Sequence, residues 1–182
     1  MIDPLFFDTD CLSAFLWAKA EGLLAGLYPD RVVIPRAVYT ELSNPDIAHL
    51  KARVDTMIAA GQAVMTEIDV GTDEYEIFYK LTQVPDAGHK IIDDGEAAAI
   101  ALAKRQDGIL ASNNLRDISL YIEEYGLKHT TTGDILVDAY QRGLVTEAEG
   151  NAIWALMIAK RRKLGAASFS DYLVWKSKPS TT

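Results

Sequence analysis

The stretch from residue 91 to 102 limits most strongly what this chain can fold into. It reads Ile-Ile-Asp-Asp-Gly-Glu-Ala-Ala-Ala-Ile-Ala-Leu. From Ala97 onward its residues are small and apolar on every side, which is typical of a helix buried between a sheet and other helices. Three carboxylates, Asp93, Asp94 and Glu96, stand where this helix begins. Burying charge there is costly unless something compensates it.

Two interpretations of these acids are open. Asp93 as N-cap with Glu96 three residues later forms a capping box, and acids suit the positive end of a helix dipole. Alternatively, the acids belong to a catalytic or metal-binding site. The choice depends on whether other acids converge on the same place.

Length and composition predict one globular domain. The chain has 182 residues, of which 49% are hydrophobic, and Cys11 is its one cysteine. No apolar run has membrane-spanning length and the N-terminus lacks the basic segment of a signal peptide, so we expect a cytoplasmic protein without a membrane partner. The net charge of −8 argues against a protein that coats nucleic acid by bulk positive charge. We interpret the basic run at residues 160–163 as a solvated helix end.

Strand and helix patterns alternate along the chain. We expect strands over residues 5–7, 31–34, 63–70, 108–111 and 128–130, and helices over residues 12–27, 35–42, 46–60, 72–81, the central stretch and 115–125. This alternation predicts an α/β fold, a three-layer α/β/α sandwich with a short, mostly parallel twisted sheet. Further helices are expected over residues 134–142, 147–162 and 169–175. We therefore predict a domain over 1–131, a helical extension packed on it over 132–175, and a frayed tail over 176–182.

Acidic residues recur at one edge of this predicted sheet. Ligands of open parallel sheets bind beyond the carboxyl ends of the strands. Asp8 follows the first strand directly, Asp117 lies one turn into the helix after strand 108–111, and Glu41 borders the apolar stripe of helix 35–42. Each acid alone has a simpler explanation as a cap, a turn residue or a solvated side chain. Together they place several carboxylates at one edge.

Such a cluster needs neutralisation. Two carboxylates about 4 Å apart repel by about 4 kcal/mol at an effective dielectric constant of about 20. Proton sharing or divalent cations relieve this, and Mg²⁺ and Mn²⁺ prefer carboxylate and water oxygens. The histidines (His49, His89 and His129) are scattered, so we expect no zinc site.

The order of these motifs resembles a PIN domain. The match is carried by Asp8-Thr9 after an apolar strand, Glu41 in the helix led by Pro35, the run from Asp94 to Ala103, and Ala-Ser-Asn-Asn-Leu-Arg-Asp at residues 111–117. The resemblance spans residues 5–130, making 1–131 a PIN-like nuclease domain. Residues 132–173 look like the helical extension of a prokaryotic PIN group described mainly as predicted nucleic-acid-binding proteins.

The resemblance implies a set of site residues. The metal-binding acids would be Asp8, Asp94 or Glu96, and Asp117, and the catalytic residues would be Asp8, Glu41, Glu96 and Asp117. Thr9 would support the first acid. Asn113 and Asn114 stand where many members have an acid, so a second metal ion would be held loosely.

The family also implies an activity. PIN domains are typically Mg²⁺- or Mn²⁺-dependent ribonucleases acting on single-stranded or structured RNA, and many are homodimeric toxins held inactive by an antitoxin protein. We therefore expect metal-assisted hydrolysis of RNA, with splayed bases stacking on an aromatic side chain such as Trp17, Tyr39 or Tyr121. One alternative is a PIN-fold binding module without turnover. The other is a haloacid-dehalogenase-like phosphatase, which the motif order disfavours because Asp93-Asp94 precedes Ser112.

Overall fold

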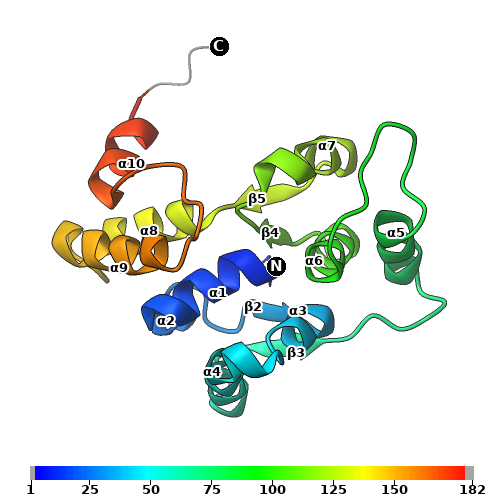
Figure 1. Cartoon of the computed structure of the whole chain (residues 1–182), viewed down its shortest axis with the longest axis horizontal. Coiled ribbons are helices and arrows are strands. Elements are labelled where there is room, and N and C mark those ends of the chain that lie inside the picture. The colour runs from blue at the N-terminus through cyan, green and yellow to red at the C-terminus, as the bar shows by residue number, and fades with distance from the viewer. Residues whose placement is uncertain (1–2, 179–182) are drawn as a thin grey trace.

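The computed structural model describes residues 3–178, and the strands in this part of the chain form one five-stranded sheet with every pairing parallel (Figure 1). The strand order is β3-β2-β1-β4-β5. The strands are β1 (Leu5–Phe7), β2 (Val32–Pro35), β3 (Val64–Thr66), β4 (Ile109–Ala111) and β5 (Lys128–Thr130). The predicted three-layer α/β/α class is confirmed, and the strand predicted over residues 63–70 is the shorter edge strand β3.

Helices fill the connections between the strands and continue after the last one. They are α1 (Thr9–Ala18), α2 (Gly22–Leu27), α3 (Arg36–Glu41), the 3-10 turn η1 (Pro45–Ile47), α4 (Ala48–Ala59), α5 (Asp73–Thr82), α6 (Asp94–Arg105), α7 (Leu115–Tyr125), α8 (Thr132–Gln141), α9 (Glu147–Ala159) and α10 (Phe169–Lys176). Within residues 3–178, no helix is both long and apolar enough to cross a bilayer.

The three layers follow from the alternation of side chains along β1. Leu5 and Phe7 belong to one hydrophobic core, and Phe6 belongs to the other, because successive side chains of a strand point to opposite faces. In Figure 1, α5, α6 and α7 lie on one side of the sheet and α1, α2, α8 and α9 lie on the other. Residues 95–103 of α6 are all buried, which confirms the prediction of a buried central helix.

The single helix predicted over residues 12–27 is wrong. Helix α1 ends because Lys19 adopts a left-handed conformation with φ of 55°. The backbone N–H of Ala20 then donates to the carbonyl of Phe15 at 2.9 Å, which closes the last turn. Glycine or asparagine usually occupies this left-handed position, so a lysine there did not indicate the break.

The helix predicted over residues 147–162 is also too long. Helix α9 ends at Ala159, and Arg161 adopts a left-handed φ of 60°. The basic run at residues 160–163 therefore lies at the end of α9 and in its connection to α10. Helix α10 continues to Lys176, the first residue of the predicted frayed tail, and residues 179–182 of that tail lie outside the described residues.

Candidate functional site

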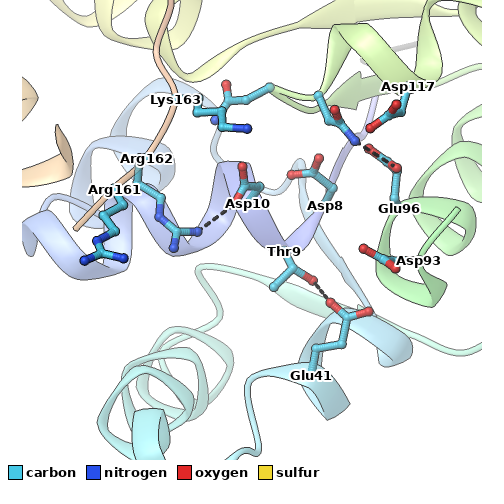
Figure 2. Close-up of a pocket in the computed structure, with 12 residues that line it drawn as sticks. Asp8, Thr9, Asp10, Glu41, Asp93, Glu96, Asp117, Arg161, Arg162 and Lys163 are labelled. Atoms are coloured by element: carbon cyan, nitrogen blue, oxygen red, sulfur yellow. Dashed lines mark hydrogen bonds and ion pairs between the residues drawn. The ribbon is translucent and has the colours of Figure 1, made fainter.

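A pocket of about 470 Å³ opens where the strand order reverses. Strands β2 and β3 lie on one side of β1, and β4 and β5 lie on the other, so the chain diverges beyond the carboxyl ends of β1 and β4. Such a reversal is where open α/β sheets bind ligands. The pocket is lined by Asp8, Thr9, Asp10, Glu41, Asp93, Glu96, Asn113, Asn114, Asp117, Arg161, Arg162 and Lys163 (Figure 2).

Asp8 is the most deeply buried acid of this pocket. It follows β1 and caps α1, with Oδ1 accepting a 2.6 Å hydrogen bond from the backbone N–H of Cys11. Burial raises the pKa of its carboxyl to about 7, against the lowering effect of the Ser112 hydroxyl and the Cys11 amide. Ser112 was not among the predicted site residues. Its position directly after β4, the neighbour of β1, was the available signal.

Glu96 is the second buried acid. It lies in the first turn of α6, and its pKa is raised to about 8, mainly by burial and then by the charge of Asp8. The side-chain amide of Asn114 donates to Glu96 Oε2 at 3.4 Å, and a further hydrogen bond from Asn114 lowers the pKa of Asp117. Asn114 therefore lies between two pocket carboxylates as a neutral donor.

The capping-box interpretation of α6 is wrong. Asp93 occupies the N-cap position, but its side chain makes no capping hydrogen bond. Asp93 and Glu96 both line the pocket instead, whereas Asp94 is exposed and is not among the lining residues. Of the two candidates for the third metal acid, the structure brings Glu96 to Asp8 and leaves Asp94 outside. Asp93 lines the pocket, although it was not among the site residues that the family resemblance implies.

Glu41 joins three elements at the pocket. Its Oε1 accepts a 2.7 Å hydrogen bond from the backbone N–H of Gly95 in α6, and its Oε2 accepts one from the hydroxyl of Thr9 in α1. A Cβ on Gly95 would lie 2.6 Å from the Thr9 oxygen and 2.8 Å from Glu41 Oε2. Glycine is therefore required for this approach, and Glu41 caps α6 from a distant part of the chain.

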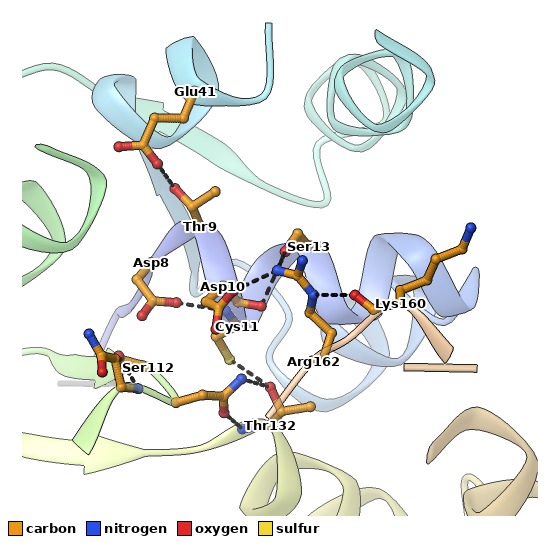
Figure 3. Close-up of polar contacts among 12 residues, drawn as sticks. Asp8, Thr9, Asp10, Cys11, Ser13, Glu41, Ser112, Thr132, Lys160 and Arg162 are labelled. Atoms are coloured by element: carbon orange, nitrogen blue, oxygen red, sulfur yellow. Dashed lines mark hydrogen bonds and ion pairs between the residues drawn. The ribbon is translucent and has the colours of Figure 1, made fainter. Parts of the chain in front are cut away.

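Asn113 is held by the C-terminal segment. Its Oδ1 accepts from the backbone N–H of Thr132 at 2.9 Å, and its Nδ2 donates to the Thr132 hydroxyl at 2.8 Å (Figure 3). Both polar atoms of the amide are thus used at the start of α8. The loop after β4 is fixed to that helix.

The basic run forms the opposite side of the pocket. In Figure 2, Arg161, Arg162 and Lys163 of the α9–α10 connection lie on the Asp10 side of the pocket, and the Arg162 guanidinium points toward Asp10. Arg162 Nη1 lies 2.6 Å from Asp10 Oδ1 and also donates to the Ser13 hydroxyl at 3.1 Å (Figure 3). Lys160, Arg161 and Lys163 are exposed at the end of α9, as predicted for a solvated helix end. That prediction did not include the position of the run beside the acids, where Arg162 is half-buried and paired. Asp10 also lines the pocket, where Arg162 pairs with it.

The carboxylates of the pocket are the ligand type that a hard divalent cation prefers, although several of them accept hydrogen bonds from protein groups in this structure. Carboxylates gathered in one pocket, two of them buried with raised pKa values, are the oxygen ligands that Mg²⁺ and Mn²⁺ prefer. Within residues 3–178, no group of three or more His, Cys, Asp or Glu side chains is spaced to hold a metal ion. In this arrangement Asp8 accepts from Cys11, Glu41 accepts from Thr9 and Gly95, and Glu96 accepts from Asn114.

Comparison with known families identifies the fold. A family model described as a PIN domain matches residues 5–173, so the chain belongs to the PIN-domain family. Proteins of this family are generally nucleases and typically use divalent metal ions. The phosphatase alternative therefore has no remaining support. Searches among curated proteins and among solved structures found no match.

Proposed function

We propose that this protein is a Mg²⁺- or Mn²⁺-dependent endoribonuclease whose active site is the pocket beyond β1 and β4. The observation that carries the proposal is the pair of buried carboxylates, Asp8 and Glu96, in a pocket that also holds Asp117 and Glu41. Burying two carboxylates close together is unfavourable unless their negative charge is compensated. A cation that binds both removes this cost.

The proposed roles follow the positions of the side chains. Asp8 and Glu96 are the deepest acids and would hold the ion, with Asp117 at the open side of the pocket. Glu41 is fixed by the Thr9 hydroxyl and the Gly95 amide, so it can hold a second ion or accept a proton from the attacking water. Arg161 and Lys163 would bind the phosphate that enters the pocket. When bound, the divalent cation supplies charge neutralisation at the phosphate and a lower pKa for water.

Substitution of Asp8 by Asn tests this assignment. The amide keeps an oxygen acceptor for the Cys11 N–H, so circular dichroism should show an intact fold. Mn²⁺-dependent cleavage of a single-stranded RNA should fall by roughly 100-fold or more, because loss of an outer-shell metal partner alone costs roughly 10- to 100-fold. D55N is the matched control, since Asp55 lies on α4 and pairs with Tyr39 and Lys51. Full activity of D8N would contradict the proposal.

One observation favours a second candidate, a PIN-fold binding module without turnover. No three acids of the described residues are spaced for a metal ion in this arrangement of side chains. Calorimetric titration with Mn²⁺ separates the two functions. Millimolar or tighter binding that is lost in D8N supports the nuclease, and the absence of binding supports the module.

The proposal includes three further properties that the resemblance to the family implies. They are a toxin role with an antitoxin protein as partner, a homodimeric state and a cytoplasmic location. Inspection of the neighbouring genes for an antitoxin tests the first, and sedimentation of the purified chain tests the second.

A further inference from the structure

A second cavity continues from the acidic pocket. Its volume is about 420 Å³, and it shares Asn113 and Lys163 with the acidic pocket. Beyond these two residues it is bounded by the start of α8 and by Tyr172, Trp175 and Lys176 of α10. A chain that leaves the acidic pocket past Lys163 therefore enters this cavity, which we call the α10 cavity.

The α10 cavity carries an exposed aromatic ring. The Trp175 side chain is 61% exposed, and its ring centroid lies 5.4 Å from that of Tyr172, which is almost buried and supports it. The aromatic residues considered from the sequence do not line either cavity. Tyr121 is buried, Tyr39 donates to Asp55, and Trp17 lies against His49 and Lys160.

Positively charged side chains line both cavities, and Lys163 lines the two of them. Arg161 and Lys163 are exposed and form no ion pair with another residue of 3–178, so their charges are available to an anion. Lys176, at the far side, lies 2.6 Å from Asp134. The chain as a whole carries a charge of −8 and repels a polyanion, so binding of a polynucleotide needs local cations beside the acids.

We propose that the α10 cavity is a nucleotide subsite, in which a base of single-stranded RNA stacks on Trp175 while Lys163 binds the phosphate leading to the acidic pocket. This inference rests on the proposed nuclease function. Aromatic rings bind unpaired bases of any sequence through their faces, and a base reaches such a ring when it is not stacked in a duplex. The subsite therefore selects for single strands over duplex.

Binding of a hydrolysis-resistant single strand tests the subsite without any need for cleavage. We would measure the fluorescence anisotropy of a labelled 2′-O-methyl RNA with the full chain in Mg²⁺. W175A should raise Kd roughly 5- to 150-fold, the range expected for loss of one base–aromatic stack. W175F should restore most of the affinity, because it keeps a ring. V174A is the matched control, since Val174 is exposed on the same helix but lines a different cavity.

Tryptophan emission gives a second measurement. Oligonucleotide binding should quench the emission of the natural chain, and this quenching should be lost in W175F, where the buried Trp154 and the partly buried Trp17 remain. K163A should lower the slope of log Kd against log salt by about 0.7, the value for one phosphate contact on a single strand. K51A, on α4, should leave the slope unchanged.

Three results would overturn the subsite: W175A binds as tightly as the natural chain, quenching persists in W175F, or W175A changes the sedimentation of the protein with no effect on RNA affinity. The last result would assign this face to a contact between copies of the chain. Failure of the nuclease proposal is distinguishable, because it leaves Trp175-dependent binding in place with no Mn²⁺-dependent cleavage.

Discussion

Helices α6 and α9 begin with the same pattern, an N-cap residue followed three positions later by Glu, but only α9 uses that Glu as a cap. In α9, the Thr146 hydroxyl accepts from the Glu149 N–H at 3.2 Å, and Glu149 Oε2 accepts from the Thr146 N–H at 2.7 Å. In α6, neither half of this box forms, and the N–H of Gly95 is satisfied by Glu41 from α3.

The electrostatic consequences of the two helix starts are opposite. Hydrogen bonds from Thr146 lower the pKa of Glu149, whereas burial and the charge of Asp8 raise the pKa of Glu96 to about 8. An acid that caps its own helix is therefore stabilised as an anion and is not available for chemistry. In α6, Glu41 accepts from the Gly95 N–H in place of the Asp93 side chain, and Asp93 and Glu96 both line the pocket. The same spacing of an N-cap residue and a Glu thus forms a cap in α9 and places an acid in the pocket in α6.

The largest expected difference between the two helices is in activity. E96Q should reduce Mn²⁺-dependent RNA cleavage by roughly 100-fold or more, because it removes a charge from the acids proposed to bind the metal ion. E149Q changes the same residue type at the equivalent position of α9 and should leave cleavage unchanged. Initial rates with a labelled single-stranded RNA give the comparison, and equal losses in both variants would remove the distinction drawn between the helices.

The next effect is on stability against pH without added metal. In the folded state the pKa of Asp8 is about 7 and that of Glu96 is about 8, whereas the usual values are 3.8 and 4.5. At pH values between the usual and the folded pKa, the folded state therefore binds more protons than the unfolded state. The free energy of unfolding should therefore fall as pH rises from about 4 to 8, by an amount on the order of a few kcal/mol. The double variant D8N/E96Q mimics the protonated acids and should flatten this fall.

Denaturant titrations at several pH values measure this effect. His129 acts in the opposite direction, because burial lowers its pKa from the usual 6.5, and its contribution increases stability as pH rises toward that value. The difference between the natural chain and the double variant cancels this contribution. A difference that does not change with pH would contradict the buried-charge explanation of the pocket.

A smaller effect is expected at Gly95. G95A places a methyl group against the Thr9 hydroxyl and both Glu41 carboxylate oxygens, all within 2.9 Å, so the cap of α6 must move. We expect a loss of roughly 1–3 kcal/mol in unfolding free energy, as for other overpacked sites, together with reduced cleavage. G22A is the matched control, since a Cβ there meets nothing within 4 Å. A G95A variant as stable and active as G22A would show that the Glu41 contact is dispensable.

The smallest effect distinguishes the caps themselves. T146A should lower the unfolding free energy by about 1 kcal/mol, the usual cost of losing an N-cap side chain, with no change in cleavage. D93A should cost less stability than T146A, because the Asp93 side chain makes no capping bond. Thermal unfolding followed by circular dichroism measures both, and an equal loss in D93A would restore the capping interpretation of α6.

Much of the fold was predictable because its signals are local. Short apolar strands alternating with helices, and small residues around α6, identified the layers and the buried helix. Asp8 was recognised because it directly follows a strand, and Glu96 because it heads the buried helix. The break at Lys19 was not predictable, since a lysine in a left-handed conformation carries no local signal.

The rest of the site depends on contacts between distant residues. Arg162 reaches Asp10, and Glu41 caps α6 through Gly95, at sequence separations of 152 and 54 residues. No periodicity or spacing reports such contacts. The basic run could be recognised as basic, but its place beside the acids follows from the packing of the C-terminal helices on α1.

The double hydrogen bond between Asn113 and Thr132 has a consequence for how this protein can be divided. The loop that carries Asn114 is hydrogen-bonded to the first turn of α8 through both polar atoms of the Asn113 side-chain amide. Removing the helical segment would leave that amide without its partners and release the loop. A shortened chain that ends before α8 is therefore not expected to reproduce the pocket of the whole protein. A molecule that displaces α8 should also move the loop that carries Asn114 beside Glu96.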